Sequence, residues 1–204
     1  MSELHDAMLW SAEVGAVRCN LCAHRCKIGE GNFGFCRVRQ NVGGKLKTHT
    51  YGQICALNVD PIEKKPLFHF LPNSMSLSIA TPGCNFRCSF CQNWRISQQS
   101  FDGDNIFATS RHTDFIPPRR LVNLAKQNGC DSISYTYTEP TIFFELAYDT
   151  ARLAHEEGIR NCFVSNGFMT PEAVQAISPH LDAINVDLKC FSDETYRKVD
   201  RKST

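Results

Sequence analysis

Three cysteines spaced Cys-x3-Cys-x2-Cys follow a Pro-Gly turn, at Cys84, Cys88 and Cys91. Iron–sulfur clusters are held by cysteine thiolates and normally take four, so a compact set of three leaves one iron of a four-iron cluster open to another ligand. Chemistry can take place at that open iron. Two other interpretations are three buried thiols that pack as small hydrophobic groups, and a zinc site completed by a histidine. Buried cysteines rarely cluster so tightly, and the nearest histidines, His69 and His112, lie well outside the motif, which favours the cluster.

A second group of four cysteines precedes the triad. Its members are Cys19, Cys22, Cys26 and Cys36. Four thiolates can close a tetrahedral zinc site, or they can hold a second iron–sulfur cluster that passes electrons. Zinc ribbons usually contain two Cys-x2-Cys pairs, whereas only Cys19 and Cys22 form one here, which slightly favours the cluster. The sequence leaves both metals open.

The composition is that of a soluble globular protein. The chain has 204 residues, of which 42% are apolar and 21% charged, and its net charge of +1 gives no sign of a nucleic-acid or anionic-membrane partner. Residues 1–10 lack the basic and apolar regions of a signal peptide, and no apolar run is long enough to span a membrane. Eleven cysteines without a secretory signal indicate metal binding by reduced thiols, so we expect a cytoplasmic protein.

Strand-like and helix-like patterns alternate in the second part of the chain. Short β-prone runs lie at residues 76–80, 132–138, 161–165 and 183–188, and the first three are each followed by a loop and a helical pattern. We expect one helix over residues 140–157, another that ends at Gly129, and a third that opens at Thr170 with proline at its first position. This alternation predicts an α/β fold of parallel βα units, as an open or closed barrel.

The first part of the chain reads differently. Gly43 and Gly44 predict a tight turn beside short strands, and residues 60–72 form a connector bounded by prolines. We therefore divide the chain into a cysteine-rich N-terminal appendage with its connector, residues 1–72, and a core, residues 73–204. Two interpretations are open for Glu63, Lys64, Lys65 and His69 of the connector: contact with a substrate or, as we expect, three solvated charges and a histidine at the edge of the core.

Polar residues follow each of the four predicted strands. In α/β barrels the active site is built at the carboxyl ends of the strands. Cys84, Glu139, Asn166, Asp187 and Lys189 all fall at or just past such an end. Four successive strands that each deliver a polar residue predict one common site.

Taken together, these motifs resemble a known family. The triad and the segments at residues 135–140, 164–167 and 185–189 resemble the pyruvate formate-lyase activating enzyme group of the radical S-adenosylmethionine (SAM) superfamily. Residues 19–36 and 60–70 look more like the AmmeMemoRadiSam-system radical SAM enzyme. The resemblance covers nearly the whole chain.

This resemblance implies a [4Fe-4S] cluster on Cys84, Cys88 and Cys91 whose open iron chelates the amino and carboxylate groups of SAM. Reduction then cleaves SAM to a 5'-deoxyadenosyl radical, which abstracts hydrogen from a substrate that the sequence does not identify. By similarity, Phe90 lies near the adenine and Asn166 near the ribose or carboxylate end. The remaining residues implied to contact SAM are Tyr137, Thr138 and Glu139 at its amino group, and Asp187 and Lys189 on the fourth strand.

The resemblance also implies partners and reveals two departures. A reductant such as flavodoxin or ferredoxin is expected, with Memo-like and AMMECR-like proteins as candidate partners. The activating enzymes have a Gly-Gly pair where Tyr137 and Thr138 stand here. Their ferredoxin-like clusters usually follow the triad, whereas the extra cysteines here precede it, which weakens the case for a second cluster.

The barrel of the resembling family consists of about six βα units, which is more than this chain supplies. This chain supplies four predicted strands and then a polar segment at residues 196–204. We therefore expect a partial barrel, cut after about four units. A partner that covers the open sheet edge and a loss of activity are the alternatives.

Two competing functions follow from the other interpretations of the cysteines. One is a non-catalytic iron–sulfur or zinc protein, either an electron carrier or a truncated fragment. The other is a cysteine-nucleophile enzyme, which we rank last because no candidate thiol has an obvious base nearby. Those candidates are Cys55, Cys130, Cys162 and Cys190.

Overall fold

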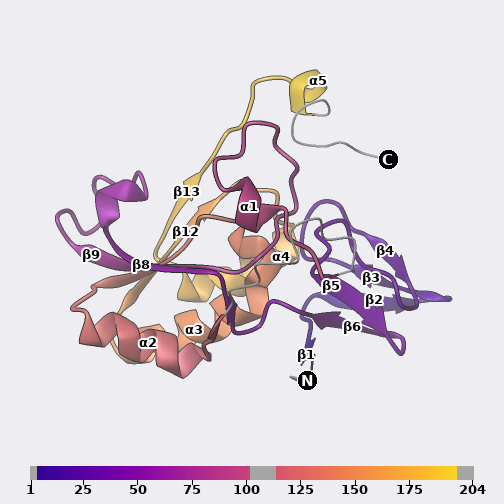
Figure 1. The fold of residues 1–204 in the computed structure, drawn as a ribbon, viewed down its shortest axis with the longest axis horizontal. Helices are drawn as coiled ribbons and strands as arrows, with labels where there is room; N and C mark the ends of the chain where they lie inside the picture. Colours follow the sequence, from indigo (N-terminus) through magenta and orange to yellow (C-terminus); the bar gives the residue numbers. More distant parts are fainter. Residues whose placement is uncertain (1–3, 102–113, 197–204) are drawn as a thin grey trace.

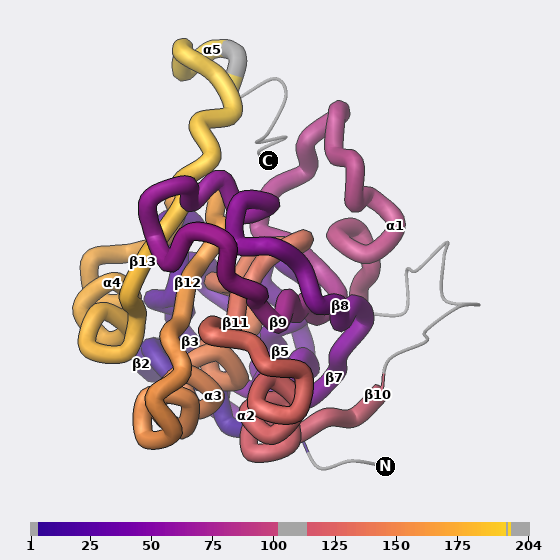
Figure 2. Tube along the Cα trace, turned by 90° about the vertical axis from the view of Figure 1, so that its left-hand side faces the viewer, coloured from indigo at the N-terminus to yellow at the C-terminus, as the bar shows by residue number. Residues whose placement is uncertain are grey.

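The computed structural model describes residues 4–101 and 114–196. His112 therefore lies outside the described residues. A five-stranded sheet forms the centre of the molecule, in the order β13-β12-β11-β9-β8 (Figures 1 and 2). Its strands are β8 (Ala56–Pro61), β9 (Met75–Ala80), β11 (Ser132–Tyr135), β12 (Arg160–Ser165) and β13 (Ala183–Val186).

The central sheet is mixed. Strands β9, β11, β12 and β13 run parallel, as the alternating sequence pattern predicts, whereas β8 runs antiparallel to β9. The four predicted strands are therefore parallel as expected, and β8 adds an antiparallel edge strand that the prediction had placed in the N-terminal appendage and connector. The segment between β8 and β9 contains only the short helix η1 (Ile62–Lys64), and such a short connection suits an antiparallel pair. Within the described residues the sheet does not close into a barrel.

Helices between the parallel strands cover one face of the sheet (Figure 1). They are α2 (Pro118–Gln127), η3 (Pro140–Phe143) continued by α3 (Phe144–Glu156), and α4 (Pro171–Ile177) followed by η4 (Ser178–His180). The hydroxyl of Thr170 accepts a hydrogen bond from the Ala173 amide and caps α4, which confirms the helix start predicted from the sequence.

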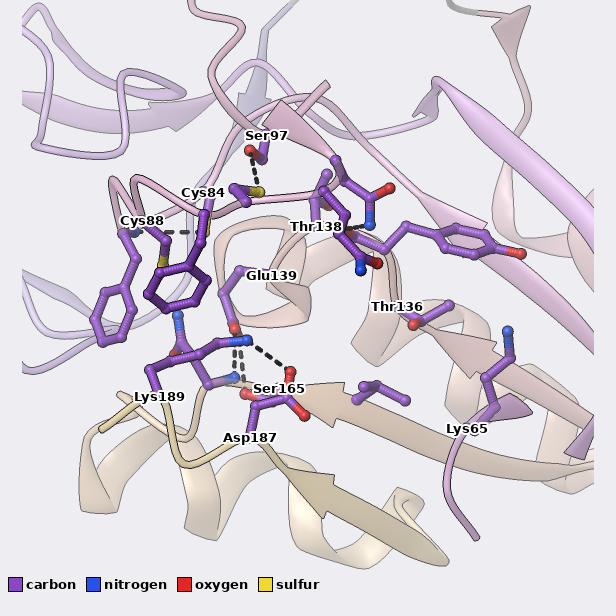
Figure 3. A pocket seen from close by; sticks show the side chains of 18 of the residues that line it. Lys65, Cys84, Cys88, Ser97, Thr136, Thr138, Glu139, Ser165, Asp187 and Lys189 are labelled. Carbon is purple, nitrogen blue, oxygen red and sulfur yellow. Dashed lines mark hydrogen bonds and ion pairs between the residues drawn. The ribbon is translucent and has the colours of Figure 1, made fainter. Parts of the chain in front are cut away.

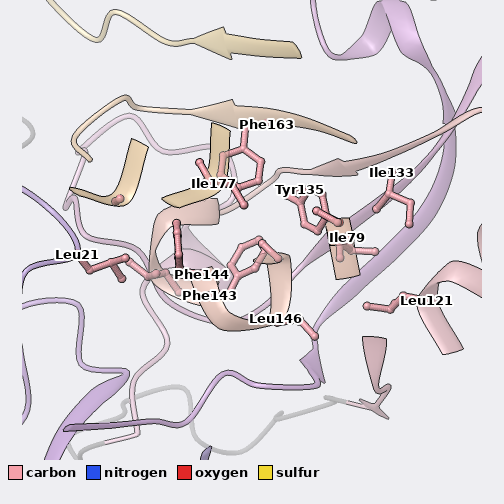
Figure 4. Packing of buried hydrophobic residues seen from close by; sticks show 14 of the residues in the cluster. Leu21, Ile79, Leu121, Ile133, Tyr135, Phe143, Phe144, Leu146, Phe163 and Ile177 are labelled. Atoms are coloured by element: carbon pink, nitrogen blue, oxygen red, sulfur yellow. The ribbon is translucent and has the colours of Figure 1, made fainter. Parts of the chain in front are cut away.

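A core of apolar side chains joins the helices to the sheet. Leu121 on α2 and Leu146 on α3 are fully buried against Ile79, Ile133 and Tyr135 of the strands (Figure 4). Burying such side chains contributes about 1.5–3 kcal/mol each, so this layer holds the carboxyl ends of the strands in a fixed arrangement.

Two small antiparallel sheets form the N-terminal part, beside the central sheet (Figure 1). One contains β2 (Trp10–Glu13), β3 (Ala16–Cys19) and β4 (Lys27–Gly29), and the other β1 (His5–Asp6), β6 (Lys45–Thr48) and β5 (Arg39–Val42). The turn between β5 and β6 is the predicted glycine pair, with φ of 62° at Gly43 and 74° at Gly44. The division of the chain at residue 72 stays a prediction.

The remaining elements are short. Strands β7 (Gln53–Ile54) and β10 (Asp114–Phe115) pair with each other, and the helices α1 (Trp94–Ser97) and α5 (Asp193–Thr195) lie in loops. Among residues 4–101 and 114–196, no helix has the length and apolar character needed to cross a bilayer.

Candidate active site

A pocket of about 450 Å³ lies at the carboxyl ends of the four parallel strands (Figure 3). The loops after β9, β11, β12 and β13 form most of its wall, and the turn after β8 closes one side. Every residue that the sequence assigned to the triad cluster or to SAM lines it. They are Cys84, Cys88, Phe90, Cys91, Tyr137, Thr138, Glu139, Asn166, Asp187 and Lys189.

Gly83 sets the path of the triad loop. Its φ is +100°, and a Cβ atom at this position would lie 2.6 Å from Cγ1 of Val38, so both the conformation and the space require glycine. The sulfur of Cys84 accepts a hydrogen bond from the Phe86 amide at 3.4 Å, and the sulfur of Cys91 lies 3.2 Å from the Ser97 hydroxyl. The backbone and α1 therefore fix two of the three thiols.

The triad thiols suit a cluster. Burial and then the charge of Glu139 raise the pKa of Cys84, so this thiol ionises only beside a compensating positive charge such as iron. Among the described residues, no three His, Cys, Asp or Glu side chains are arranged to hold a single metal ion. A four-iron cluster binds each thiolate to a different iron, so it does not require the sulfurs to meet at one ion.

Glu139 is the most buried acidic group of the pocket, at 1% exposure. Its Oε1 accepts hydrogen bonds from the Thr141 amide (3.0 Å), the Thr141 hydroxyl (2.6 Å) and the Ser165 hydroxyl (2.8 Å). Its Oε2 accepts one from the Asn166 amide at 2.8 Å. Burial raises the pKa of Glu139 while these hydrogen bonds oppose the rise. The result is a carboxylate held in one orientation in the pocket wall.

Tyr137 occupies an unusual backbone position. Its φ is +63°, and its carbonyl accepts a hydrogen bond from the Asn93 side chain at 2.8 Å. The next residue, Thr138, donates its hydroxyl to the Thr81 carbonyl at 2.9 Å. Glycine adopts positive φ without strain. The loop therefore keeps a glycine-type backbone conformation at the place where the resembling activating enzymes have Gly-Gly.

Asn166 connects two walls of the pocket. Its side-chain amide donates to Oδ1 of Asn85 at 2.8 Å, and its own Oδ1 accepts from the Phe168 amide at 3.0 Å. The side chain predicted to lie near the ribose or carboxylate end of SAM thus ties the loop after β12 to the triad loop.

Asp187 and Lys189 form an ion pair of 2.7 Å after β13 (Figure 3). Burial opposes the charge on Lys189, but the hydrogen bond with Asp187 and the neighbouring negative charges together outweigh it and raise the pKa of the lysine. The ammonium group therefore stays charged on the pocket wall.

The expectation that Lys65 is a solvated charge is wrong. This side chain is 2% exposed, its Nζ lies 2.8 Å from Asp60 Oδ2, and it stands 4.8 Å from the centroid of the Tyr137 ring. Tyr137 in turn donates its hydroxyl to Asp60. Lys64 is exposed as expected, and both lysines line the pocket. The sequence around Lys65 gives no sign that this lysine is buried, because its burial depends on contacts with residues of other segments, such as Tyr137. His69, expected at the core edge, is exposed.

The other cysteines fall into two sets. Cys19, Cys22, Cys26 and Cys36 line a second, smaller cavity in the N-terminal part. Burial raises the pKa of the Cys55 thiol to about 12 and that of Cys162 to about 11. Thiols with such pKa values supply little thiolate at neutral pH, which argues against either as a nucleophile.

The structure thus defines an α/β protein with a thiol-rich pocket at the carboxyl ends of its parallel strands. The chain belongs to the radical SAM superfamily, since the family model of that name matches residues 78–204. Members of this superfamily use a [4Fe-4S] cluster and a reductant to cleave SAM.

Three relatives illustrate the range of similarity. The uncharacterized protein MJ0808 of Methanocaldococcus jannaschii is 45% identical over 96% of this chain and 56% of its own length. A probable GTP 3',8-cyclase of Saccharolobus islandicus is 29% identical over 57% of this chain and 35% of its own length. A putative glycyl-radical enzyme activating enzyme of M. jannaschii, MJ1632, is 22% identical over 60% and 43%. The chain spans about half the length of the curated relatives that match nearly all of it.

Proposed function

We propose that Cys84, Cys88 and Cys91 hold the [4Fe-4S] cluster and that the adjoining pocket binds SAM, whose cleavage yields a radical that abstracts hydrogen from a substrate. One observation carries this proposal: residues from the loops after four different strands, each singled out by type and position in the sequence, line a single pocket. Its volume of about 450 Å³ lies within the roughly 300–1,000 Å³ typical of small-molecule sites.

The charges of the wall match the charged groups of SAM. When bound, the cluster supplies the electron that splits the sulfonium into methionine and a 5'-deoxyadenosyl radical. The carboxylate of Glu139, already fixed by Thr141 and Ser165, neutralises the amino group of SAM. Lys189, kept charged by Asp187, attracts its carboxylate. Because these groups are held before SAM arrives, little reorganisation opposes binding.

The exposed Phe90 serves a different part of the cofactor. Its ring is 54% exposed and borders the pocket, so it offers an apolar surface on which the adenine can stack. Asn166 joins the loop after β12 to the triad loop through its hydrogen bond to Asn85. The positive φ of Tyr137 turns the segment of Tyr137 and Thr138 so that it contacts Thr81 and Asn93. We therefore assign the backbone of this segment to the amino end of SAM.

The finer assignment concerns the substrate and the partners. We propose an activating-enzyme-like radical SAM enzyme of the AmmeMemoRadiSam type, on the strength of residues 19–36 and 60–70. The relative named as a putative glycyl-radical enzyme activating enzyme supports the broader part of this assignment. A flavodoxin or ferredoxin as reductant, Memo-like and AMMECR-like partners and a cytoplasmic location complete the proposal.

Electron paramagnetic resonance tests the proposal directly. The chain is reconstituted anaerobically with iron and sulfide, reduced with dithionite, and measured with and without SAM. We expect a reduced-cluster signal that changes when SAM is added, and the loss of that response in Cys88→Ala. Cys130→Ala is the matched control, because Cys130 precedes β11 at the opposite end of the strands. A cluster in the parent chain that ignores SAM would contradict the proposal and favour a non-catalytic iron–sulfur protein.

A further inference from the structure

The four N-terminal cysteines face one cavity. Cys19 ends β3, and Cys22, Cys26 and Cys36 lie in the loops around it. Three of the four are buried and Cys26 is partly buried. All four thiols fall within residues 19–36 and line the same cavity, and thiolates are the usual ligands of zinc and of iron–sulfur clusters. The arrangement points to a shared metal centre.

A buried arginine is directed at these sulfurs. Arg39 is 1% exposed and donates from one terminal nitrogen to the sulfur of Cys19 at 3.2 Å, while the other forms an ion pair with Glu145. Its Nε has no hydrogen-bond partner among the described residues. The Phe35 amide also donates to the sulfur of Cys26, at 3.4 Å. N–H groups directed at sulfur are contacts that metal-bound thiolates accept.

The geometry that each metal requires bears on the two metals left open by the sequence. In a tetrahedral zinc site with Zn–S bonds of about 2.3 Å, the sulfurs lie about 3.8 Å apart around one point. Within residues 4–101 and 114–196, no three such ligands are gathered tightly enough to hold one ion. The same holds for the triad, which the family assigns to a cluster. Neither group is therefore arranged as a single-ion site, and only Cys19 and Cys22 form the Cys-x2-Cys pair of which a zinc ribbon usually has two, so a cluster fits the N-terminal group better than zinc.

The second cavity borders the triad loop. His24, which lines the cavity, makes a 2.8 Å hydrogen bond with the Asn85 carbonyl, next to Cys84. Arg87 donates to the Cys84 carbonyl at 2.8 Å and to the Phe35 carbonyl at 2.9 Å. These contacts join the loop segments next to Cys22, Cys26 and Cys36 directly to the loop that carries Cys84.

We propose that Cys19, Cys22, Cys26 and Cys36 ligate a second four-iron cluster. Since all four irons carry thiolates, this cluster has no open position for SAM and acts as a one-electron carrier. It accepts one electron from a low-potential donor protein and passes one electron to the cluster on the triad loop. That second step rests on the function proposed above, whereas the existence of the cluster does not.

A triad-free variant tests the second cluster alone. In Cys84→Ala/Cys88→Ala/Cys91→Ala, reconstituted anaerobically, we expect about four iron and four sulfide ions per chain, half of the parent's content. The cluster should be reduced by dithionite and give a paramagnetic signal that SAM does not change. Zinc without sulfide, or no bound metal, in this variant would overturn the proposal.

The reciprocal variant separates this proposal from the proposed function. Cys22→Ala/Cys26→Ala should retain about four iron ions, all on the triad, and a signal that still responds to SAM. If this variant keeps the parent's full iron content, the second cluster is refuted. If the triad-free variant binds its cluster while the parent's signal ignores SAM, the proposed function fails and the second cluster stands.

Discussion

Replacing Gly83 by alanine tests how the triad loop is held. Gly83 has φ of +100°, and an added Cβ would lie 2.6 Å from Cγ1 of Val38 and 3.6 Å from the carbonyl oxygen of Cys36. Gly129 is a matched control, because its φ is +64° but nothing lies within 4 Å of an added Cβ. The two substitutions share the backbone conformation penalty and differ in the steric clash.

The expected loss of stability follows from these two terms. A left-handed backbone conformation costs a residue with a side chain about 1–2 kcal/mol. Forcing an extra methyl group into a packed region costs about 1–3 kcal/mol more. The free energy of unfolding should therefore fall by about 2–5 kcal/mol in Gly83→Ala and by about 1–2 kcal/mol in Gly129→Ala.

Urea denaturation of the chain measures both losses as shifts of the midpoint at constant slope. Gly83→Ala should also bind less iron after reconstitution, since the clash displaces the loop that carries Cys84. Equal losses of stability in the two variants would refute the reasoning, because they would mean that Val38 does not limit the space at Gly83.

Three further predictions concern single side chains, each measured by urea denaturation. Burial raises the pKa of Glu139, so the folded chain binds the carboxyl proton more tightly than the unfolded chain and loses stability as the pH rises above 4.5. Glu139→Gln should flatten this pH dependence of the free energy of unfolding, and an unchanged pH dependence would contradict the prediction. Burial opposes ionisation of Asp60, but the hydrogen bonds from Lys65 and Tyr137 lower its pKa below 3.8. Its stabilisation is therefore complete above pH 3.8 and lost in stronger acid, and Asp60→Asn should remove this acid-dependent loss. Thr170→Ala removes the cap of α4 and should lower the free energy of unfolding by about 1 kcal/mol, whereas no change would show that the cap contributes nothing.

Local patterns were sufficient to predict the parallel strands and the residues at their ends. The runs around Ile79, Ile133 and Phe163 are short, apolar and separated by helical patterns, and such signals require no knowledge of distant contacts. Parallel strands place their carboxyl ends at one edge, so Cys84 and Glu139 had to lie close together.

Long-range contacts could not be predicted in the same way. Strand β8 pairs with β9 although the sequence analysis placed it in the N-terminal appendage and connector, and Lys65 is buried by Asp60 and Tyr137, of which Tyr137 lies far away in the sequence. Arg39 and Glu145 form a buried pair across 106 residues of sequence. Partners so far apart leave no periodic signal, because the fold alone brings them together.

The central claim is that the Cys84 loop supports reductive cleavage of SAM. The most direct measurement is the formation of 5'-deoxyadenosine by the reconstituted chain with dithionite and SAM. The parent chain and Cys130→Ala should form it, and Cys88→Ala should form none. A parent chain that carries a full cluster but yields no 5'-deoxyadenosine, or a Cys88→Ala variant as productive as the parent, would contradict the claim.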